Sequence, residues 1–223
     1  MIPLIDVHTH QPRGCAIELI AVQTPNTPEG FCSLGIHPWR VGSLSDEQIA
    51  EELRLIAEAD VVAIGETGAD GVCGGDLERQ LEVFDAHLEI AERRNLPVII
   101  HSVKCFERIM QKLAGHNLRA VIFHSWIGSE EQATRATTKG YRLSFGPRSL
   151  ASSRSANTLK SIDEKYILTE SDDSGEDISH IYQKIAQLRN QSEEHLREVV
   201  FNNFSTIWQS GWSVPSCCSV PRN

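Results

Sequence analysis

Histidines and carboxylates follow short apolar runs at intervals along this chain of 223 residues. The residues concerned are His8, His10, His37, Glu66, His101, His124 and Asp172. Imidazole and carboxylate ligands suit zinc, manganese and iron and, less well, magnesium. A divalent ion held by such groups can acidify water for hydrolysis. The sequence therefore predicts metal-dependent chemistry if the fold gathers these side chains.

The pair His8 and His10 flanks a threonine at the end of the first apolar run. Side chains alternate along an extended strand, so both imidazoles point to the same side and can hold one ion. Such a pair by itself is more often two surface or hydrogen-bonded histidines. The presence of the other histidines and carboxylates reverses that interpretation.

Two carboxylates have roles that depend on their neighbours. Glu66, between imidazole sites, could bridge two divalent ions, or it could simply pair with a lysine or cap Gly68. Asp172 could bind a metal and accept a proton from its bound water, although a lone aspartate is more often a helix N-cap. Only convergence in space would select the catalytic interpretation for both.

The remaining histidines and the cysteines are expected to lie outside the site. The four histidines within or at the ends of predicted helices are interpreted as structural or solvated: His87, His116, His180 and His195. Cys73 and Cys105 would lie at the open face of the fold, but they lack a regular partner spacing and are interpreted as bystanders. The six cysteines form no CxxC pair, so free thiols are expected.

Short β-branched runs alternate with helical stretches over most of the chain, which is typical of parallel βα units. The predicted strands are Leu4–Val7, Ile17–Val22, Ser33–Ile36, Val61–Ile64, Val98–Ile100, Val121–Phe123, Arg142–Ser144 and Tyr166–Thr169. The predicted helices are Asp46–Glu58, Leu77–Arg94, Phe106–Leu113, Glu130–Lys139, Ile178–Arg189 and Glu193–Val200. Because the carboxyl ends of parallel barrel strands surround one opening, the candidate residues would converge there.

The first two connections are too short for crossover helices. The stretch from His8 to Cys15 is brief, and the one from Gln23 to Cys32 contains Pro25. We therefore predict an α/β fold: a TIM-type (β/α)8 barrel with abbreviated first two connections. A single barrel domain over residues 1–210 and a flexible C-terminal tail over 211–223 are expected.

Composition limits the partners. A formal net charge of −9 argues against a broad basic face for nucleic acid, although bound divalent ions could still attract a phosphate substrate. The chain has no segment apolar enough to span a bilayer and shows no signal or transit peptide, so a cytoplasmic protein without membrane contact is expected. No obligate protein partner is evident.

Several motifs resemble, in order, those of the TatD family of metal-dependent deoxyribonucleases. They are Asp6-Val7-His8-Thr9-His10, Gly35-Ile36-His37-Pro38, Ile64-Gly65-Glu66-Thr67-Gly68-Ala69-Asp70, Leu96-Pro97-Val98-Ile99-Ile100-His101, Phe123-His124, Leu143-Ser144-Phe145-Gly146, Leu168-Thr169-Glu170-Ser171-Asp172 and Asn202-Asn203-Phe204. The resemblance covers nearly the whole chain apart from the tail and the abbreviated first connections.

The resemblance implies two divalent metal ions (Zn, Mn or Mg) and a role for each candidate residue. One ion would be bound by His8 and His10 and the other by His101 and His124. Glu66 would lie between them and Asp172 at the reacting water. His37 and Lys104 could hold a phosphate. The implied activity is hydrolysis of phosphodiester bonds at DNA ends, like that of a 3′-5′ exonuclease.

Departures from the family pattern leave the substrate open. The family often has a proline where this chain has Ser174, and a leucine and an aromatic residue where it has Ala69 and Gly71-Val72. After the fourth motif an arginine is commoner, whereas Val103 and Lys104 follow here, as in a shorter branch of the family. Alternatives are a hydrolase of a small lactone, cyclic amide or phosphoester using the same metal site, and a non-catalytic metal-binding scaffold.

Overall fold

The computed structural model describes residues 2–208, in which eight parallel strands are hydrogen-bonded in chain order. The strands are β1 Ile5–Thr9, β2 Ile17–Gln23, β3 Cys32–Gly35, β4 Ala63–Asp70, β5 Val98–Val103, β6 Val121–Phe123, β7 Arg142–Phe145 and β8 Ile167–Thr169. The last strand returns to the first: the Asp172 amide donates to the His8 carbonyl (2.9 Å), and the His10 amide donates to the Asp172 carbonyl (3.1 Å). The predicted TIM-type fold, an almost closed barrel, is confirmed.

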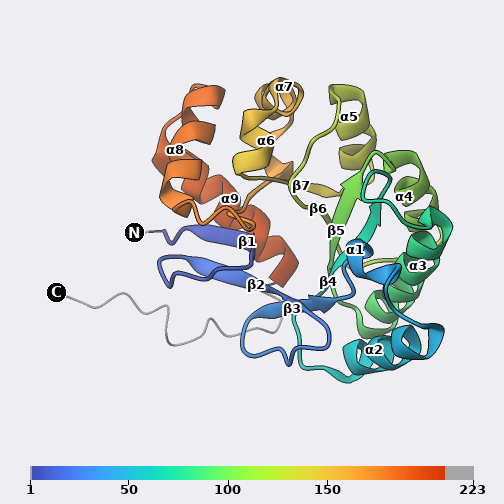
Figure 1. Ribbon diagram of the computed structural model, residues 1–223. Helices are drawn as coiled ribbons and strands as arrows, with labels where there is room; N and C mark the ends of the chain where they lie inside the picture. The colour runs from blue at the N-terminus through green and yellow to red at the C-terminus, as the bar shows by residue number, and fades with distance from the viewer. Residues whose placement is uncertain (1, 209–223) are drawn as a thin grey trace.

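Helices surround the strands except over the first two connections (Figure 1). They are α1 Pro38–Val41, α2 Asp46–Glu58, α3 Leu77–Arg94, α4 Phe106–Leu113, α5 Glu130–Thr138, α6 Pro147–Ala151, α7 Ser153–Ser161, the 3-10 turn η1 Glu164–Tyr166, α8 Ile178–Arg189 and α9 Glu193–Trp208. No helix stands between β1 and β2 or between β2 and β3, as the short connections predicted. The short helices α1, α6 and α7 and the turn η1 were not predicted.

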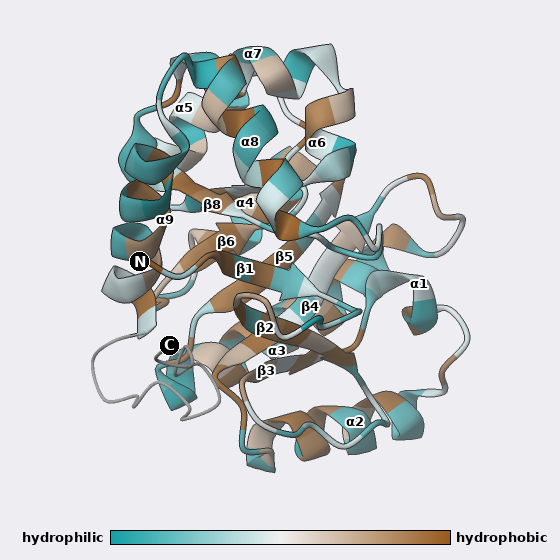
Figure 2. Ribbon diagram, turned by 90° about the vertical axis from the view of Figure 1, so that its left-hand side faces the viewer, coloured by the Kyte–Doolittle hydropathy of each residue, from teal (hydrophilic) through white to brown (hydrophobic). Residues whose placement is uncertain are grey.

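Local signals explain where the helices begin and end. Ser45 caps α2 with a full capping box, and Asp76 caps α3 by accepting from two backbone amides. Asn95 ends α3 in the left-handed conformation. Figure 2 shows hydrophobic colour on the strands and hydrophilic colour on much of the outer helical surface. The core therefore lies between barrel and helices.

The predicted end of the last helix at Val200 is wrong, because α9 continues to Trp208. Polar residues interrupt the apolar pattern there, but Asn203 is buried and its amide nitrogen donates to the carbonyls of Glu164 (2.7 Å) and Ile167 (2.9 Å). Beyond it the helix buries Phe204 and Trp208.

The end of α9 packs against the N-terminal part of the barrel, where the abbreviated connections contain no helix. The ring of Phe31, just before β3, lies 5.8 Å from that of Phe204 and 6.0 Å from that of Trp208. The Trp208 indole donates to the Val62 carbonyl (3.1 Å). The N-terminal strands thus bury apolar surface against the final helix rather than against helices of their own.

The fourth strand is the largest difference from the predicted strands. It was expected to end at Ile64, but β4 continues to Asp70. Gly65 and Gly68 made this part of the sequence look like a turn rather than a strand. Their φ angles are 133° and 140°, which only glycine adopts readily. A Cβ on Gly68 would lie 2.0 Å from the His101 carbonyl oxygen. The glycines therefore let β4 run close beside β5 and carry Glu66 into the barrel mouth.

Within residues 2–208, no helix is long and apolar enough to cross a membrane. The tail expected over 211–223 lies outside the described residues.

Candidate metal centre

The carboxylate of Glu66 lies at the centre of the barrel mouth, and its side chain is 3% exposed. One oxygen, Oε1, faces three imidazoles. It lies 2.7 Å from Nε2 of His124, 2.8 Å from Nδ1 of His101 and 3.1 Å from Nε2 of His37. Strands β3 to β6 thus deliver these groups to a single oxygen.

The other oxygen of Glu66, Oε2, faces the first strand. It lies 3.4 Å from Nε2 of His8 and 3.6 Å from Nε2 of His10. Both imidazoles are also 3.8 Å from Oδ1 of Asp172. The two oxygens of one buried carboxylate therefore divide the histidines into two groups.

The charge of this carboxylate is set by its neighbours. Burial alone would raise the pKa of Glu66, but the charge on His124 and hydrogen bonds from His10, His101 and His124 outweigh burial and hold the pKa well below its usual value. Glu66 is therefore ionised at neutral pH, as a metal ligand must be.

Ligand atoms gather in four overlapping groups, within each of which they lie within 4.8 Å of one another. The groups are His8–His10–Asp172, His8–Glu66–His124, His37–Glu66–His101 and His124–Glu170–Asp172. All six predicted ligands are thus brought together. His37, predicted only to hold a phosphate, also joins a possible ligand group.

Unpaired polar atoms in the cluster fit a bound cation. Both ring nitrogens of His8, Nδ1 of His124 and Oε1 of Glu170 are buried without a hydrogen-bond partner among the described residues. Leaving such atoms unpaired costs about 1–3 kcal/mol each. Divalent metal ions would satisfy them, and the His and carboxylate donors suit zinc, manganese and, less well, magnesium.

The sequence interpretation missed Glu170 as a site residue. Its side chain is fully buried, Ser144 donates a hydrogen bond to its Oε2, and its Oε1 lies 3.7 Å from Nδ1 of His124. A signal for it existed. Glu170 precedes Asp172 by two positions, so the period of an extended segment places both side chains on one side.

Asp70 was also missed, although it lies in the third motif. Its Oδ2 accepts from Nε2 of His101 (3.2 Å) and from the indole of Trp39 (2.7 Å). Its Oδ1 accepts from the amides of Val72 (2.8 Å) and Cys73 (3.1 Å). A carboxylate held in this way fixes the orientation of a ligand imidazole.

Asp6 ties the first strand to the segment that carries Asp172. Its oxygens accept from the backbone amide (3.0 Å) and hydroxyl (2.6 Å) of Ser171 and from the amide of His8 (3.3 Å). Burial raises the pKa of Asp6 to about 7 despite these hydrogen bonds. Asp6 thus fixes the position of His8 relative to Asp172.

Asp172 is held by its backbone between the two histidines of the first motif, with φ of 54°. An aspartate tolerates this left-handed conformation better than most residues. Its Oδ2 lies 3.8 Å from Nε of Arg148, a half-exposed side chain that also pairs with Asp173 (2.8 Å). A cationic group therefore stands at the mouth beside Asp172.

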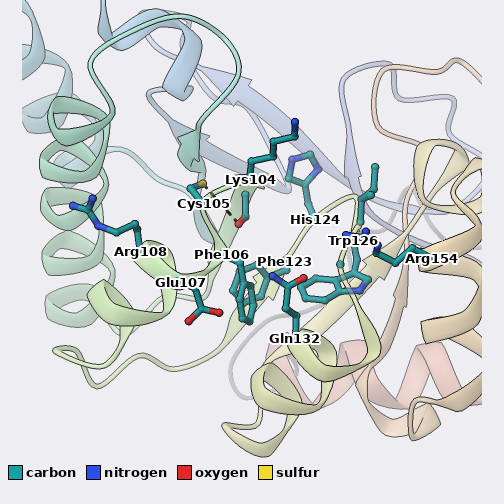
Figure 3. Close-up of a pocket in the computed structure, with 13 residues that line it drawn as sticks. Lys104, Cys105, Phe106, Glu107, Arg108, Phe123, His124, Trp126, Gln132 and Arg154 are labelled. Atoms are coloured by element: carbon teal, nitrogen blue, oxygen red, sulfur yellow. Dashed lines mark hydrogen bonds between the residues drawn. The ribbon is translucent and has the colours of Figure 1, made fainter.

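Lys104 lies beside the ligand cluster, in the lining of a cavity that also includes His124 (Figure 3). It is exposed at the end of β5 with φ of 51°.

The other histidines lie outside the cluster, as predicted. His87 is fully buried and accepts from the Ile36 amide (3.0 Å) while donating to the Val83 carbonyl (2.7 Å). His116 and His195 pair with acidic side chains, and His180 is exposed. Cys15, Cys32, Cys73 and Cys105 are free thiols, and the remaining two cysteines lie outside the described residues.

Comparison with known proteins gives relatives over most of the chain. A family model described as "TatD related DNase" matches residues 15–209. The chain is 28% identical over 202 residues to the "Uncharacterized metal-dependent hydrolase YjjV" of Escherichia coli, covering 80% of this chain and 76% of that protein. The crystal structure of YjjV, a TatD homologue, superposes with a TM-score of 0.78 at 25% identity, covering 94% of this chain and 99% of that one.

A named exonuclease is also similar over part of its length. The "3'-5' ssDNA/RNA exonuclease TatD" of Pantoea ananatis is 35% identical over 124 residues, which is 53% of this chain and 46% of that protein. The alignment therefore covers less than half of that exonuclease.

Proposed function

Since this chain belongs to the TatD related DNase family of metal-dependent hydrolases, we propose that it removes nucleotides from the ends of single-stranded DNA by phosphodiester hydrolysis. One observation carries the proposal: Oε1 and Oε2 of the buried Glu66 face separate groups of histidines. Two-ion sites with a shared carboxylate suit in-line displacement at phosphorus. The names of several relatives as ssDNA/RNA exonucleases support this substrate class.

The proposed ligands follow the two groups. His8, His10 and Asp172 would hold one ion, and His101 and His124 would hold the other, with Glu66 shared between them. When bound, divalent ions supply Lewis-acid polarisation of the phosphate and acidify a nearby water.

The protein's own side chains would supply proton transfer and substrate contacts. Asp172 would take the proton of the attacking water, since its carboxylate lies beside the His8 and His10 imidazoles. Water would add to phosphorus as the bond to the 3′-oxygen breaks, which releases a nucleoside 5′-monophosphate. Arg148, next to Asp172, and Lys104, at the edge of the mouth, would bind phosphate oxygens.

The experiment is a substrate panel on purified protein with Mn, Mg, Zn or no metal. It includes end-labelled single-stranded DNA, duplex DNA, RNA, a nitrophenyl phosphodiester and a lactone. We expect metal-dependent shortening of single-stranded DNA from its 3′ end. Asp172→Asn serves as the inactive variant and the exposed Asp60→Asn as its matched control.

Other outcomes would redirect the proposal. Rapid lactone hydrolysis without any phosphodiester cleavage would mean that the same centre serves a small-molecule hydrolase. Metal binding without turnover of any member of the panel would support a scaffold instead.

A further inference from the structure

The junction between the first and last strands is built differently from the other strand junctions of the barrel. From β1–β2 to β7–β8, neighbouring strands pair along their backbones. Where β1 meets β8 and the segment after it, residues 2–208 contain a single backbone bridge, between Thr9 and Asp172. Figure 1 shows the blue start of the chain beside the orange and red helices of its end. We call the junction of β1 with residues 167–172 the seam.

Side chains take the place of a backbone ladder along the seam. The Ile5 amide donates to the hydroxyl of Tyr182 on α8 (3.0 Å), and the Ile5 carbonyl accepts from the hydroxyl of Thr169 (2.7 Å). Next along the strand, the Asp6 carboxylate accepts from the amide (3.0 Å) and the hydroxyl (2.6 Å) of Ser171. The seam can therefore open by the loss of a few side-chain bonds, without unfolding of a ladder.

The backbone bonds of the seam lie at the barrel mouth, among proposed metal ligands. The Asp172 amide donates to the His8 carbonyl (2.9 Å), and the His10 amide donates to the Asp172 carbonyl (3.1 Å). The side chains of the same three residues form one of the candidate ligand groups. Two of its ligands come from one side of the seam and one from the other. An ion bound by this group would therefore fasten both sides together.

The other proposed ion position joins strands that are already paired. Its ligands Glu66, His101 and His124 come from β4, β5 and the end of β6. Five residue pairs join β4 to β5, among them Gly68 with His101, and three pairs join β5 to β6. An ion at this position would bind across continuous backbone ladders, so it adds little to the pairing of the strands.

We infer that the group of His8, His10 and Asp172 has a structural function besides its proposed part in catalysis: with a divalent ion bound, it closes the barrel at the seam. The inference rests on the ion position of the proposed function but on no substrate. Opening of the seam separates Asp172 from both histidines, so an ion held by all three residues binds the closed form only. Such selective binding stabilises the closed seam by mass action.

Amide hydrogen exchange tests the inference, because it reports the opening of individual backbone bonds. The amides to follow by NMR are those of His10 and Asp172, the two donors across the seam. Zinc alone is the probe. With zinc about 100-fold above its Kd, exchange of both amides should slow by up to about 100-fold. Unchanged exchange rates in protein shown by elemental analysis to hold zinc would overturn the inference.

Two ligand variants separate the two ion positions. His101→Asn weakens the position away from the seam and should keep the zinc-dependent protection of the Asp172 amide. His10→Asn weakens the position across the seam and should lose most of this protection, with zinc still bound near His101 and His124. Equal protection of the Asp172 amide in the two zinc-loaded variants would contradict a special role for the group at the seam.

A variant outside the ligand set tests the seam itself. Thr169→Val removes the hydroxyl that bonds the Ile5 carbonyl, so exchange of the Asp172 amide in zinc-free protein should be about tenfold faster. Thr137→Val is the matched control, because it removes another buried hydroxyl, which donates to the Ala133 carbonyl within α5 (2.9 Å). It should leave the Asp172 amide unchanged. Equal rates in the two variants would show that the seam does not open as a unit.

A cleavage assay on the same zinc-loaded protein distinguishes failure of this inference from failure of the proposed function. Zinc-dependent protection of the seam without cleavage of any DNA would support the structural role and remove the nuclease. Trimming of single-stranded DNA by protein whose seam exchanges at the zinc-free rate would remove the structural role and leave the nuclease.

Discussion

The carboxylate of Asp70 accepts a hydrogen bond from Nε2 of His101 (3.2 Å), while Nδ1 of the same ring lies 2.8 Å from Glu66. The Trp39 indole holds the same carboxylate oxygen from the other side (2.7 Å). Asp70 therefore acts through His101: it selects the tautomer and aims the free nitrogen at the centre.

Asp70→Asn should weaken metal binding between about 10-fold and 100-fold, because the amide no longer fixes the His101 tautomer. Titration with a competing chelator measures the affinity. The exposed Asp60→Asn should bind metal like the wild type. A wild-type affinity in Asp70→Asn would contradict the positioning role.

Asp172→Asn should lower kcat by at least about 10²-fold while the group formed by His101, His124 and Glu66 keeps its metal, because the amide retains shape but cannot accept a proton. Glu66→Ala should reduce both metal content and rate, since it removes the carboxylate that both groups face. Elemental analysis beside turnover on labelled DNA checks both variants. Equal metal content in the two variants would refute these roles.

The folded protein should take up about one to two divalent ions per chain, because six candidate ligands converge at the barrel mouth. Metal at about 100-fold above its Kd should raise the free energy of unfolding by about 2.7 kcal/mol per site. Elemental analysis and thermal melts with and without chelator measure this. Folded protein that stays near zero stoichiometry after incubation with Mn or Zn would remove the site.

His87 should make the metal-free protein less stable at acidic pH. Burial lowers its pKa to about 4 from 6.5, so the unfolded chain binds the proton more readily. The stabilisation by neutral His87 is complete above about pH 6.5 and is lost as pH falls toward 4, in total roughly 3 kcal/mol. Urea unfolding across this range should show a shallower pH slope in His87→Gln, and equal slopes would disprove the assignment.

Trimming of DNA should be distributive and nearly independent of strand length. With a net charge of −9, affinity should depend mainly on the terminal nucleotide rather than on a basic track along the strand. Product ladders at low enzyme concentration measure this. Processive degradation of long duplexes would reveal a binding surface that the charge distribution does not suggest.

The order of strands, most helix limits and the convergence of the candidate ligands could be predicted because apolar periodicity and parallel topology decide them. The course of β4 could not. Gly65 and Gly68 look like a turn in sequence, and only the packing of β4 against β5 shows that they permit close backbone approach. Asp70 was missed for a related reason, because its importance lies in the contact with His101, a property of tertiary structure. Glu170 did have a signal in the sequence, its spacing of two positions from Asp172.

The contact of Phe31 with Phe204 and Trp208 also has a consequence for how the chain is made. During translation, β1 to β3 emerge from the ribosome long before α9. The apolar surface that α9 buries in the folded protein therefore stays exposed to solvent while the rest of the chain is synthesised. A nascent chain halted before α9 should therefore be a target for chaperones and prone to aggregation, even though every proposed metal ligand has already been made.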